Sequence, residues 1–252
     1  MLIIRKCKSF ILIISHRHKF IFLKPFKVAG SSTEFALSSI VSKNDIVTNL
    51  SKDEEKKRYS LFGIKEQNNR LPLSKLLSGF SKQNKKDIRK LTWPKVFHPH
   101  CSAAEVKRYV GDDIWNEYKK ISIIRNPWDY LLSFYYWNPS DQNRPEFKNW
   151  IFENRHLIGA NNVHYHIDNE CIMDAFIRYE HLLTDIDRLP IDSKQRIKVK
   201  QILENTSLKS GYRERDKHKE LEMLNQTNFI DKAIEAFCAL ELQQFKYEKP
   251  KI

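Results

Sequence analysis

Short, mostly apolar runs alternate along the chain with stretches that have the spacing of a helix. The clearest runs cover residues 20–23 (FIFL) and 121–124 (ISII), and continuous runs of this kind are typical of strands buried in a parallel sheet. Each run leads through a turn into apolar residues placed three or four apart, and residues 176–179 form a third strand of the same type. Strands alternating with helices predict an α/β fold, with three layers around a central parallel sheet flanked by helices.

Other segments carry weaker signals of the same kinds. Ser102 and Glu105 fit a capping box, which predicts a helix over residues 103–110 ended by Gly111. Further helices are predicted over residues 112–118, 146–154, 193–203 and 228–245, a short strand over residues 164–167, and a basic loop over residues 209–219.

The pattern also suggests a domain organisation. We expect an N-terminal extension over residues 1–18 and a single domain over residues 19–252, with a divergent polar insertion at residues 44–94. The apolar run at residues 10–14 is short and lacks a small-residue cleavage site, and no segment approaches the roughly 18 apolar residues of a membrane span. The expectation is a soluble, cytoplasmic protein without a transmembrane segment; weak membrane association and the oligomeric state stay open.

The composition limits the classes of protein to which this chain can belong. Hydrophobic residues make up 41% of the chain and aromatic residues 12%, which argues for a folded protein. The net charge of +13 favours an anionic partner, or else simply a lysine-rich solvated surface. The four cysteines are far apart and indicate neither a disulfide framework nor a zinc site. The pairs His98/His100 and His164/His166 lack further ligands at suitable spacing, so no metal is expected.

Two turns that follow strands have the composition of anion sites. After residues 20–23 comes KPFKVAGSSTE, in which Lys27 precedes Gly30 and a run of hydroxyl residues, Ser31, Ser32 and Thr33, that are candidate helix N-caps. Backbone N–H groups and the helix dipole point at an anion placed there. After residues 121–124, Arg125 opens a second turn, and Ser133 lies two helical turns further on.

Together these segments resemble the sulfotransferase superfamily. KPFKVAGSSTE is similar to that family's 5′-phosphosulfate loop, and IIRNPWDYLLSFYYW to its 3′-phosphate motif. HPHCSAAEVKRYVGDDIW and FIRYEHLLTDIDRL resemble segments of bacterial and carbohydrate sulfotransferases, so the resemblance spans about residues 19–247. Phe26 stands where the family usually has proline, and Val28 where it has threonine.

The resemblance implies a P-loop-like fold and a nucleotide co-substrate. The donor would be 3′-phosphoadenosine 5′-phosphosulfate (PAPS), from which a sulfuryl group moves to an acceptor hydroxyl, here on a carbohydrate. No metal is required on this account, unlike Mg²⁺-dependent phosphoryl transfer. The residues expected to hold the 5′ end are Lys27, Ala29, Gly30, Ser31, Ser32 and Thr33. Arg125 and Ser133 would hold the 3′-phosphate, and Lys27 would also stabilise charge on the leaving phosphate.

Two assignments leave alternatives open. His100 is the first candidate for the base that takes the acceptor's proton, because its pKa range suits that task. His98 and Glu34 are weaker candidates, and His100 could instead simply pack at a helix start. In the basic loop, Arg213 is a further cation for the 3′ end of the donor, and a solvated loop is the alternative.

Rival functions predict other features. A P-loop kinase needs G-x-x-x-x-G-K-[ST], with lysine after the glycines, and the chain has no such string. A non-catalytic polyanion-binding protein is suggested by the charge, but we find no module with interleaved basic and aromatic residues, and no nucleic-acid partner is expected. A third possibility is a sulfotransferase fold that has lost its activity.

Overall fold

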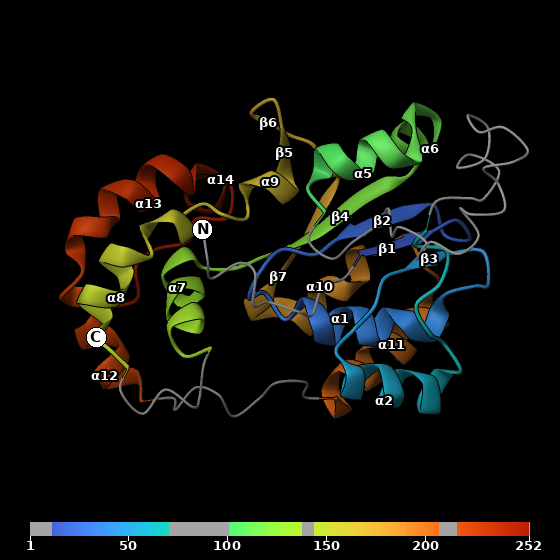
Figure 1. Ribbon diagram of the computed structural model, residues 1–252, viewed down its shortest axis with the longest axis horizontal. Coiled ribbons are helices and arrows are strands. Elements are labelled where there is room, and N and C mark those ends of the chain that lie inside the picture. Colours follow the sequence, from blue (N-terminus) through green and yellow to red (C-terminus); the bar gives the residue numbers. More distant parts are fainter. Residues whose placement is uncertain (1–11, 71–100, 138–143, 207–215, 252) are drawn as a thin grey trace, which may run out of the picture.

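The computed structural model describes residues 12–70, 101–137, 144–206 and 216–251. The chain forms a mixed α/β fold around a five-stranded sheet in the order β3-β1-β2-β4-β7 (Figure 1). The strands are β1 (Leu12–Ser15), β2 (Phe20–Leu23), β3 (Ile46–Val47), β4 (Lys119–Ile124) and β7 (Ala175–Arg178), and β5 (His166–Ile167) pairs with β6 (Glu170–Cys171) in a separate ribbon. Strands β2, β4 and β7 are parallel, whereas β1 is antiparallel to both of its neighbours. The sheet is therefore mixed, and the prediction of a parallel sheet is right only for its centre.

Helices cover both faces of the sheet. The α-helices are α1 (Gly30–Leu37), α2 (Lys52–Phe62), α5 (Ala103–Val110), α6 (Asp112–Glu117), α7 (Pro127–Tyr135), α8 (Phe147–Glu153), α9 (Asn162–Tyr165), α10 (Leu182–Asp185), α11 (Ser193–Asn205), α12 (Lys217–Asn225), α13 (Asp231–Phe237) and α14 (Ala239–Gln243). Because side chains alternate along a strand, Phe20 and Phe22 pack toward α1 and α11, while Ile21 and Leu23 pack toward α5 and α6. Both faces are thus buried, which explains why β2 reads as a continuous apolar run.

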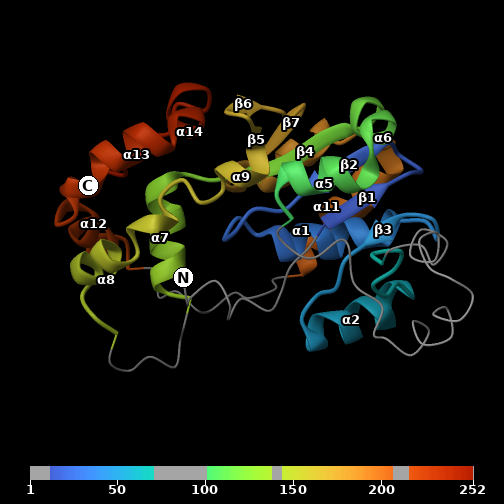
Figure 2. The ribbon, with the colours of Figure 1, turned by 45° about the horizontal axis from the view of Figure 1, so that its top comes forward.

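A helical lobe lies to one side of the sheet. Helices α7, α8, α12, α13 and α14 gather there in both ribbon views (Figures 1 and 2). Their shared core includes Leu131, Ile151, Leu224 and Ile234, all nearly or fully buried. Helix α7 follows directly from β4 and so joins the lobe to the carboxyl edge of the sheet.

A strand of the sheet lies within the segment predicted as an N-terminal extension. Leu12–Ser15, assigned to an extension, form an internal strand whose four residues are all buried. The turn that follows is fixed by the buried carboxylate of Asp45, which accepts hydrogen bonds from the Ser15 hydroxyl and the His16 N–H. The short apolar run at residues 10–14 indicates at most a peripheral strand or a loosely held extension, whereas β1 lies between β3 and β2.

The polar stretch at residues 44–94 also contributes elements to the fold. Its described part supplies β3 to the sheet and α2 to the face covered by α1. A capping box at Ser51 and Glu54 starts α2, and Gly63, with a φ of 68°, ends it. Residues 71–94 of the predicted insertion lie outside the described residues.

Three further predictions, of a helix, a strand and a loop, differ in part from the structure. The helix predicted over residues 228–245 is broken at Cys238, which separates α13 from α14. Residues 164 and 165 end α9, so only the second half of the strand predicted at residues 164–167 is extended. Helix α12 begins at Lys217, inside the segment predicted as a loop.

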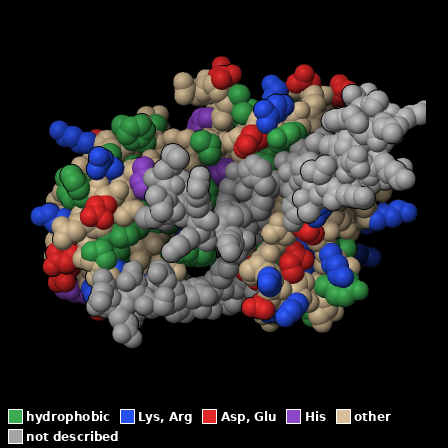
Figure 3. All heavy atoms as spheres, in the orientation of Figure 1, with side chains coloured by type: hydrophobic (Ala, Val, Ile, Leu, Met, Phe, Trp, Pro, Cys, Tyr) green, Lys and Arg blue, Asp and Glu red, His purple; other side chains and the backbone are tan. Residues whose placement is uncertain are grey.

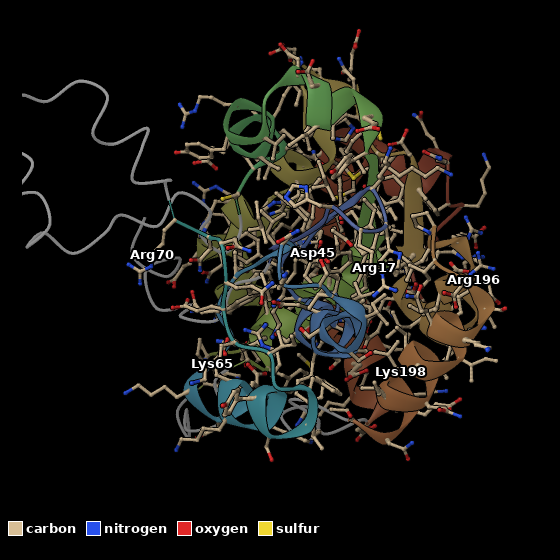
Figure 4. The ribbon with its side chains drawn as sticks, turned by 90° about the vertical axis from the view of Figure 1, so that its right-hand side faces the viewer. Arg17, Asp45, Lys65, Arg70, Arg196 and Lys198 are labelled. Atoms are coloured by element: carbon tan, nitrogen blue, oxygen red, sulfur yellow. The ribbon has the colours of Figure 1, made fainter. Side chains whose placement is uncertain are left out.

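Charged side chains are spread over the surface. Acidic and basic side chains are interspersed over α2 in the space-filling view (Figure 3). At the end of the molecule shown in Figure 4, Arg17 comes from the β1–β2 turn, Lys65 and Arg70 follow α2, and Arg196 and Lys198 lie on α11. Among the described residues, no helix is long and apolar enough to span a membrane.

Candidate anion-binding site

The turn between β2 and α1 leads directly into the start of a helix, whose first two residues, Gly30 and Ser31, are buried. Lys27 and Ala29 adopt left-handed backbone conformations, with φ of 57° and 58°, and Ala29 is the N-cap of α1. Alanine has no side-chain acceptor, and the first N–H groups of a helix have no acceptor within the helix. Such N–H groups are a common binding site for anions in proteins.

The hydroxyl residues lie inside the helix rather than at its cap. Sequence reasoning proposed Ser31, Ser32 and Thr33 as N-caps, but α1 begins at Gly30. The Thr33 hydroxyl is buried and donates to the Ala29 carbonyl at 3.2 Å. The Ser31 hydroxyl accepts from the Lys24 ammonium at 2.8 Å, and Ser32 is half-buried.

Two lysines, Lys24 and Lys27, lie between β2 and α1, and their side chains have different surroundings. Lys24 is 7% exposed and its Nζ lies at the first turn of α1. Lys27 places its Nζ 3.5 Å from the centre of the Trp137 ring and 5.9 Å from that of Phe134, next to α7. The sequence pattern singles out Lys27, while Lys24 follows directly after an apolar strand and belongs to none of the predicted site residues.

Distant residues hold the backbone of the turn. Asn161 Oδ1 accepts from the Phe26 N–H at 2.8 Å, and Asn161 Nδ2 donates to the Phe26 carbonyl at 3.2 Å. Arg125 Nη1 donates to the Lys27 carbonyl. Sequence reasoning missed Asn161, since it lies 135 positions from its partner and belongs to no recognisable motif.

Arg125 itself is tightly packed. Its Nε and Nη2 both lie 2.6 Å from Asp129 Oδ2, and its guanidinium stacks 3.9 Å from the ring centre of Tyr179. A guanidinium has five N–H groups, so these contacts and the bond to Lys27 leave others for an anion. Ser133 is half-buried on α7, eight residues after Arg125. It lies four residues after Asp129 and therefore on the same face of the helix as Asp129.

The start of α7 is capped by protein groups. Asn126 Oδ1 accepts from the N–H groups of Trp128 and Asp129. Glu180 accepts hydrogen bonds from the Asn126 N–H, at 3.0 Å, and from the Tyr247 hydroxyl. The pKa of Tyr247 is raised, mainly by burial and also by its hydrogen bond to Glu180. At this second turn, the groups that could meet an anion are therefore the Arg125 and Ser133 side chains rather than helix N–H groups.

Glu34 is unsuited to the role of base. Its side chain is completely buried beneath the turn, and Oε1 accepts from Arg58 Nη1 at 3.1 Å. Burial raises the pKa of Glu34 well above its usual range, and the positive charges of Arg58 and Lys24 oppose that shift. Arg58 also contacts Glu55 and the Thr48 carbonyl, so the group ties α1, α2 and β3 together.

The histidine region is described only in part. His98, His100 and Arg213 lie outside the described residues, so the structure places none of them. Next to that segment, His164 is buried, contacts the Cys101 carbonyl through Nδ1 at 3.2 Å, and lies 5.6 Å from the Phe26 ring. Burial lowers the pKa of His164 to about 4, so its imidazole is neutral at pH 7.

Two further features bear on ligands. A pocket of about 260 Å³ lies at α5 and α6, lined in part by Lys107, Arg108 and Asp112, and includes none of the predicted site residues. In the described part of the chain, no group of three or more His, Cys, Asp or Glu side chains is arranged to hold a metal ion.

The site thus joins two segments that are far apart in sequence. The Arg125–Lys27 hydrogen bond links the β2–α1 turn to the β4–α7 turn, at the carboxyl ends of adjacent parallel strands. Crevices outside the carboxyl ends of parallel strands are where α/β folds bind ligands. Comparison with protein-family models finds no match to this chain, and searches of curated proteins and of solved structures likewise find none.

Proposed function

We propose that the protein is a PAPS-dependent sulfotransferase that acts on an acceptor hydroxyl, with a carbohydrate as the acceptor class. The observation that carries the proposal is the direct contact between the two turns, because Arg125 bonds the backbone of the turn that contains Lys27. A nucleotide with phosphates at both its 3′ and 5′ positions needs two anion sites at a fixed separation. The segments that resemble the sulfotransferase motifs supply such a pair, on a P-loop-like arrangement of strand, turn and helix.

Each end of the donor has partners of suitable chemistry. At the 5′ end, the first N–H groups of α1 and the half-buried Ser32 surround an anion at the positive end of the helix dipole. At the 3′ end, Asp129 holds the Arg125 guanidinium in one orientation, and charge-assisted bonds from such a fixed fork are strong. Ser133 adds a hydroxyl on the same face of α7.

The reaction is a single displacement at sulfur. The bond between sulfur and the 5′-phosphate oxygen breaks, a bond between sulfur and the acceptor oxygen forms, and the acceptor's proton passes to a base. Negative charge grows on the leaving phosphate, and the helix N–H groups and lysine ammonium groups of the β2–α1 turn stabilise it. His100 remains the proposed base, and Arg213 a proposed further contact to the 3′ end.

Binding of 3′,5′-ADP, the desulfated donor, tests the proposal. We expect micromolar binding by calorimetry, and a loss of about 10- to 100-fold in Arg125→Ala, the usual effect of removing hydrogen bonds to a charged group. Arg155→Ala removes an exposed arginine that follows α8 in the helical lobe and is the matched control. Absence of binding by the wild type, or binding of Mg²⁺–ATP in preference to 3′,5′-ADP, contradicts the proposal.

A further inference from the structure

We propose that Glu180 and Tyr247 are positioning residues of the donor site, which hold the β4–α7 turn so that Arg125 meets the 3′-phosphate of the bound nucleotide. This assignment rests on the proposed function and deepens it. It gives a role to the C-terminal residues 247–249, which lie outside the four segments that resemble sulfotransferase motifs.

Glu180 joins the β4–α7 turn to the C-terminal residues. Its Oε1 atom accepts a hydrogen bond from the Asn126 N–H at 3.0 Å, and its Oε2 atom accepts one from the Tyr247 hydroxyl. Asn126 directly follows Arg125, so the first bond restrains the backbone next to the arginine. Glu180 itself comes two residues after the end of β7, and one carboxylate therefore connects three segments.

The C-terminal residues make a second contact with Asn126. Its Nδ2 atom donates to the Glu248 carbonyl at 2.8 Å. Its Oδ1 atom caps α7 by accepting from the N–H groups of Trp128 and Asp129. Asp129 in turn holds the Arg125 guanidinium through Oδ2. Hydrogen bonds therefore run without a break from the C-terminal residues to Arg125.

The C-terminal residues are themselves anchored on both sides of this contact. The Tyr247 ring stacks on Phe245, with ring centres 6.2 Å apart, and packs against the buried cluster at the end of β4. Lys249 forms an ion pair with Asp231, with 3.0 Å between Nζ and Oδ2. The other oxygen of Asp231 accepts from Trp128 Nε1 at 3.0 Å, so Lys249 is linked to the first turn of α7 by a separate route.

The position of Arg125 decides how far apart the two anion sites lie. Its guanidinium contacts Asp129, stacks on the Tyr179 ring and bonds the Lys27 carbonyl. Tyr179 directly precedes Glu180, so a shift of Glu180 would also move the ring on which the guanidinium lies. A side chain that is already held in its bound position loses less conformational entropy when the ligand arrives. Loss of this support should therefore weaken binding of the 3′-phosphate specifically.

The test compares 3′,5′-ADP with adenosine 5′-monophosphate, which lacks only the 3′-phosphate. Glu180→Ala and Tyr247→Phe each break the bridge, and we expect either to weaken 3′,5′-ADP by about 3- to 10-fold, since the bonds are exposed to solvent. The affinity for adenosine 5′-monophosphate, measured by displacement of 3′,5′-ADP, should stay within about twofold of the wild type. Glu204→Ala on α11 and Tyr59→Phe on α2 are exposed controls and should change neither affinity.

Two further variants separate positioning from a general loss of stability. Glu180→Gln keeps an oxygen for the Asn126 N–H and an amide group for the Tyr247 hydroxyl, so it should bind 3′,5′-ADP within about twofold of the wild type. In an Arg125→Ala background, Glu180→Ala should not weaken 3′,5′-ADP further, because the group that it positions is gone. Thermal unfolding of each variant checks that it is folded.

Several results overturn the assignment. It is wrong if either Glu180→Ala or Tyr247→Phe binds 3′,5′-ADP like the wild type, or if these variants weaken both ligands equally. It is also wrong if Glu180→Ala weakens binding as much in the Arg125→Ala background as in the wild type. A wild-type protein that binds neither ligand, or binds both equally well, instead refutes the proposed function itself, and the two failures are therefore distinguishable.

Discussion

Single residues in the buried parts of this protein carry constraints that their neighbours in sequence do not reveal. Gly30 is one example, because the stem of Lys24 fills the space that any larger side chain would occupy. Glu241 is another: only 6% exposed, it carries an Oε2 atom for which the described residues provide no hydrogen-bond partner.

Gly30→Ala should destabilise the protein through its clash with Lys24. Overpacking of this kind typically costs about 1–3 kcal/mol. The same substitution in a Lys24→Ala background should cost less, because the stem is gone. Urea unfolding of the four proteins in this cycle measures the coupling, and equal costs in both backgrounds would contradict the packing argument.

Glu241 should make the stability of the protein depend on pH. Burial raises the pKa of Glu241 to about 7 from a usual value of 4.5, so the folded state favours the protonated form. The stability that this preference adds to the folded state is fully present below pH 4.5 and is lost as the pH rises through 7. The free energy of unfolding falls by about 3 kcal/mol in all. Glu241→Gln should lack this loss, so its free energy of unfolding relative to the wild type should rise between pH 5 and pH 8. A constant difference over that range would show that Glu241 does not titrate in this way.

At the scale of elements, the turn between β2 and α1 depends on residues that other segments supply. Its backbone bends through two left-handed residues, Lys27 and Ala29, neither of which is glycine. Such conformations are disfavoured for residues with a Cβ and persist where the surroundings impose them. Asn161 and Arg125 impose them here, through hydrogen bonds to the backbone of Phe26 and Lys27.

Asn161→Ala should therefore loosen this turn. We expect a loss of about 1–3 kcal/mol, because two hydrogen bonds to nearly buried groups disappear, together with faster hydrogen exchange of the Phe26 amide. Asn162→Ala is the matched control, since it removes a single exposed bond to the Phe237 carbonyl. Asn161→Asp keeps the acceptor for the Phe26 N–H and loses the donor, so its effect should lie between the two. Unchanged exchange at Phe26 in Asn161→Ala would remove Asn161 from this role.

At the scale of the whole molecule, buried charges join segments that read as separate in sequence. Arg58, fully buried on α2, contacts Glu34 of α1, Glu55 of its own helix and the carbonyl of Thr48 after β3. A polar stretch predicted as an insertion is thereby tied to the core beneath the candidate site.

Arg58→Leu should destabilise the protein by about 3–5 kcal/mol, because it leaves the Glu34 carboxyl buried without its partner. Adding Glu34→Gln should recover part of that loss. Lys56→Leu, on the exposed side of α2, should change stability by less than about 0.5 kcal/mol. Thermal and urea unfolding measure all three, and a small effect of Arg58→Leu would mean that α2 contributes little to the core.

Elements whose signals lie within a few residues could be predicted from the amino-acid sequence. The capping box at Ser102 and Glu105 predicted α5 with the bounds the structure shows, and the apolar runs predicted β2 and much of β4. The α/β class and the two turns after β2 and β4 follow from the same local signals, because hydrophobic period and capping chemistry act over one or two turns of chain.

Contacts between groups that are far apart in sequence could not be predicted in this way. The antiparallel placement of β1, the Arg58–Glu34 pair, the hold of Asn161 on Phe26 and the passage of Lys24 over Gly30 all depend on three-dimensional packing. These contacts involve buried polar groups whose partners are set by topology rather than by spacing along the chain. For the same reason, the sequence indicated a lysine-bearing anion turn, while the fold determined which lysine reaches the start of the helix.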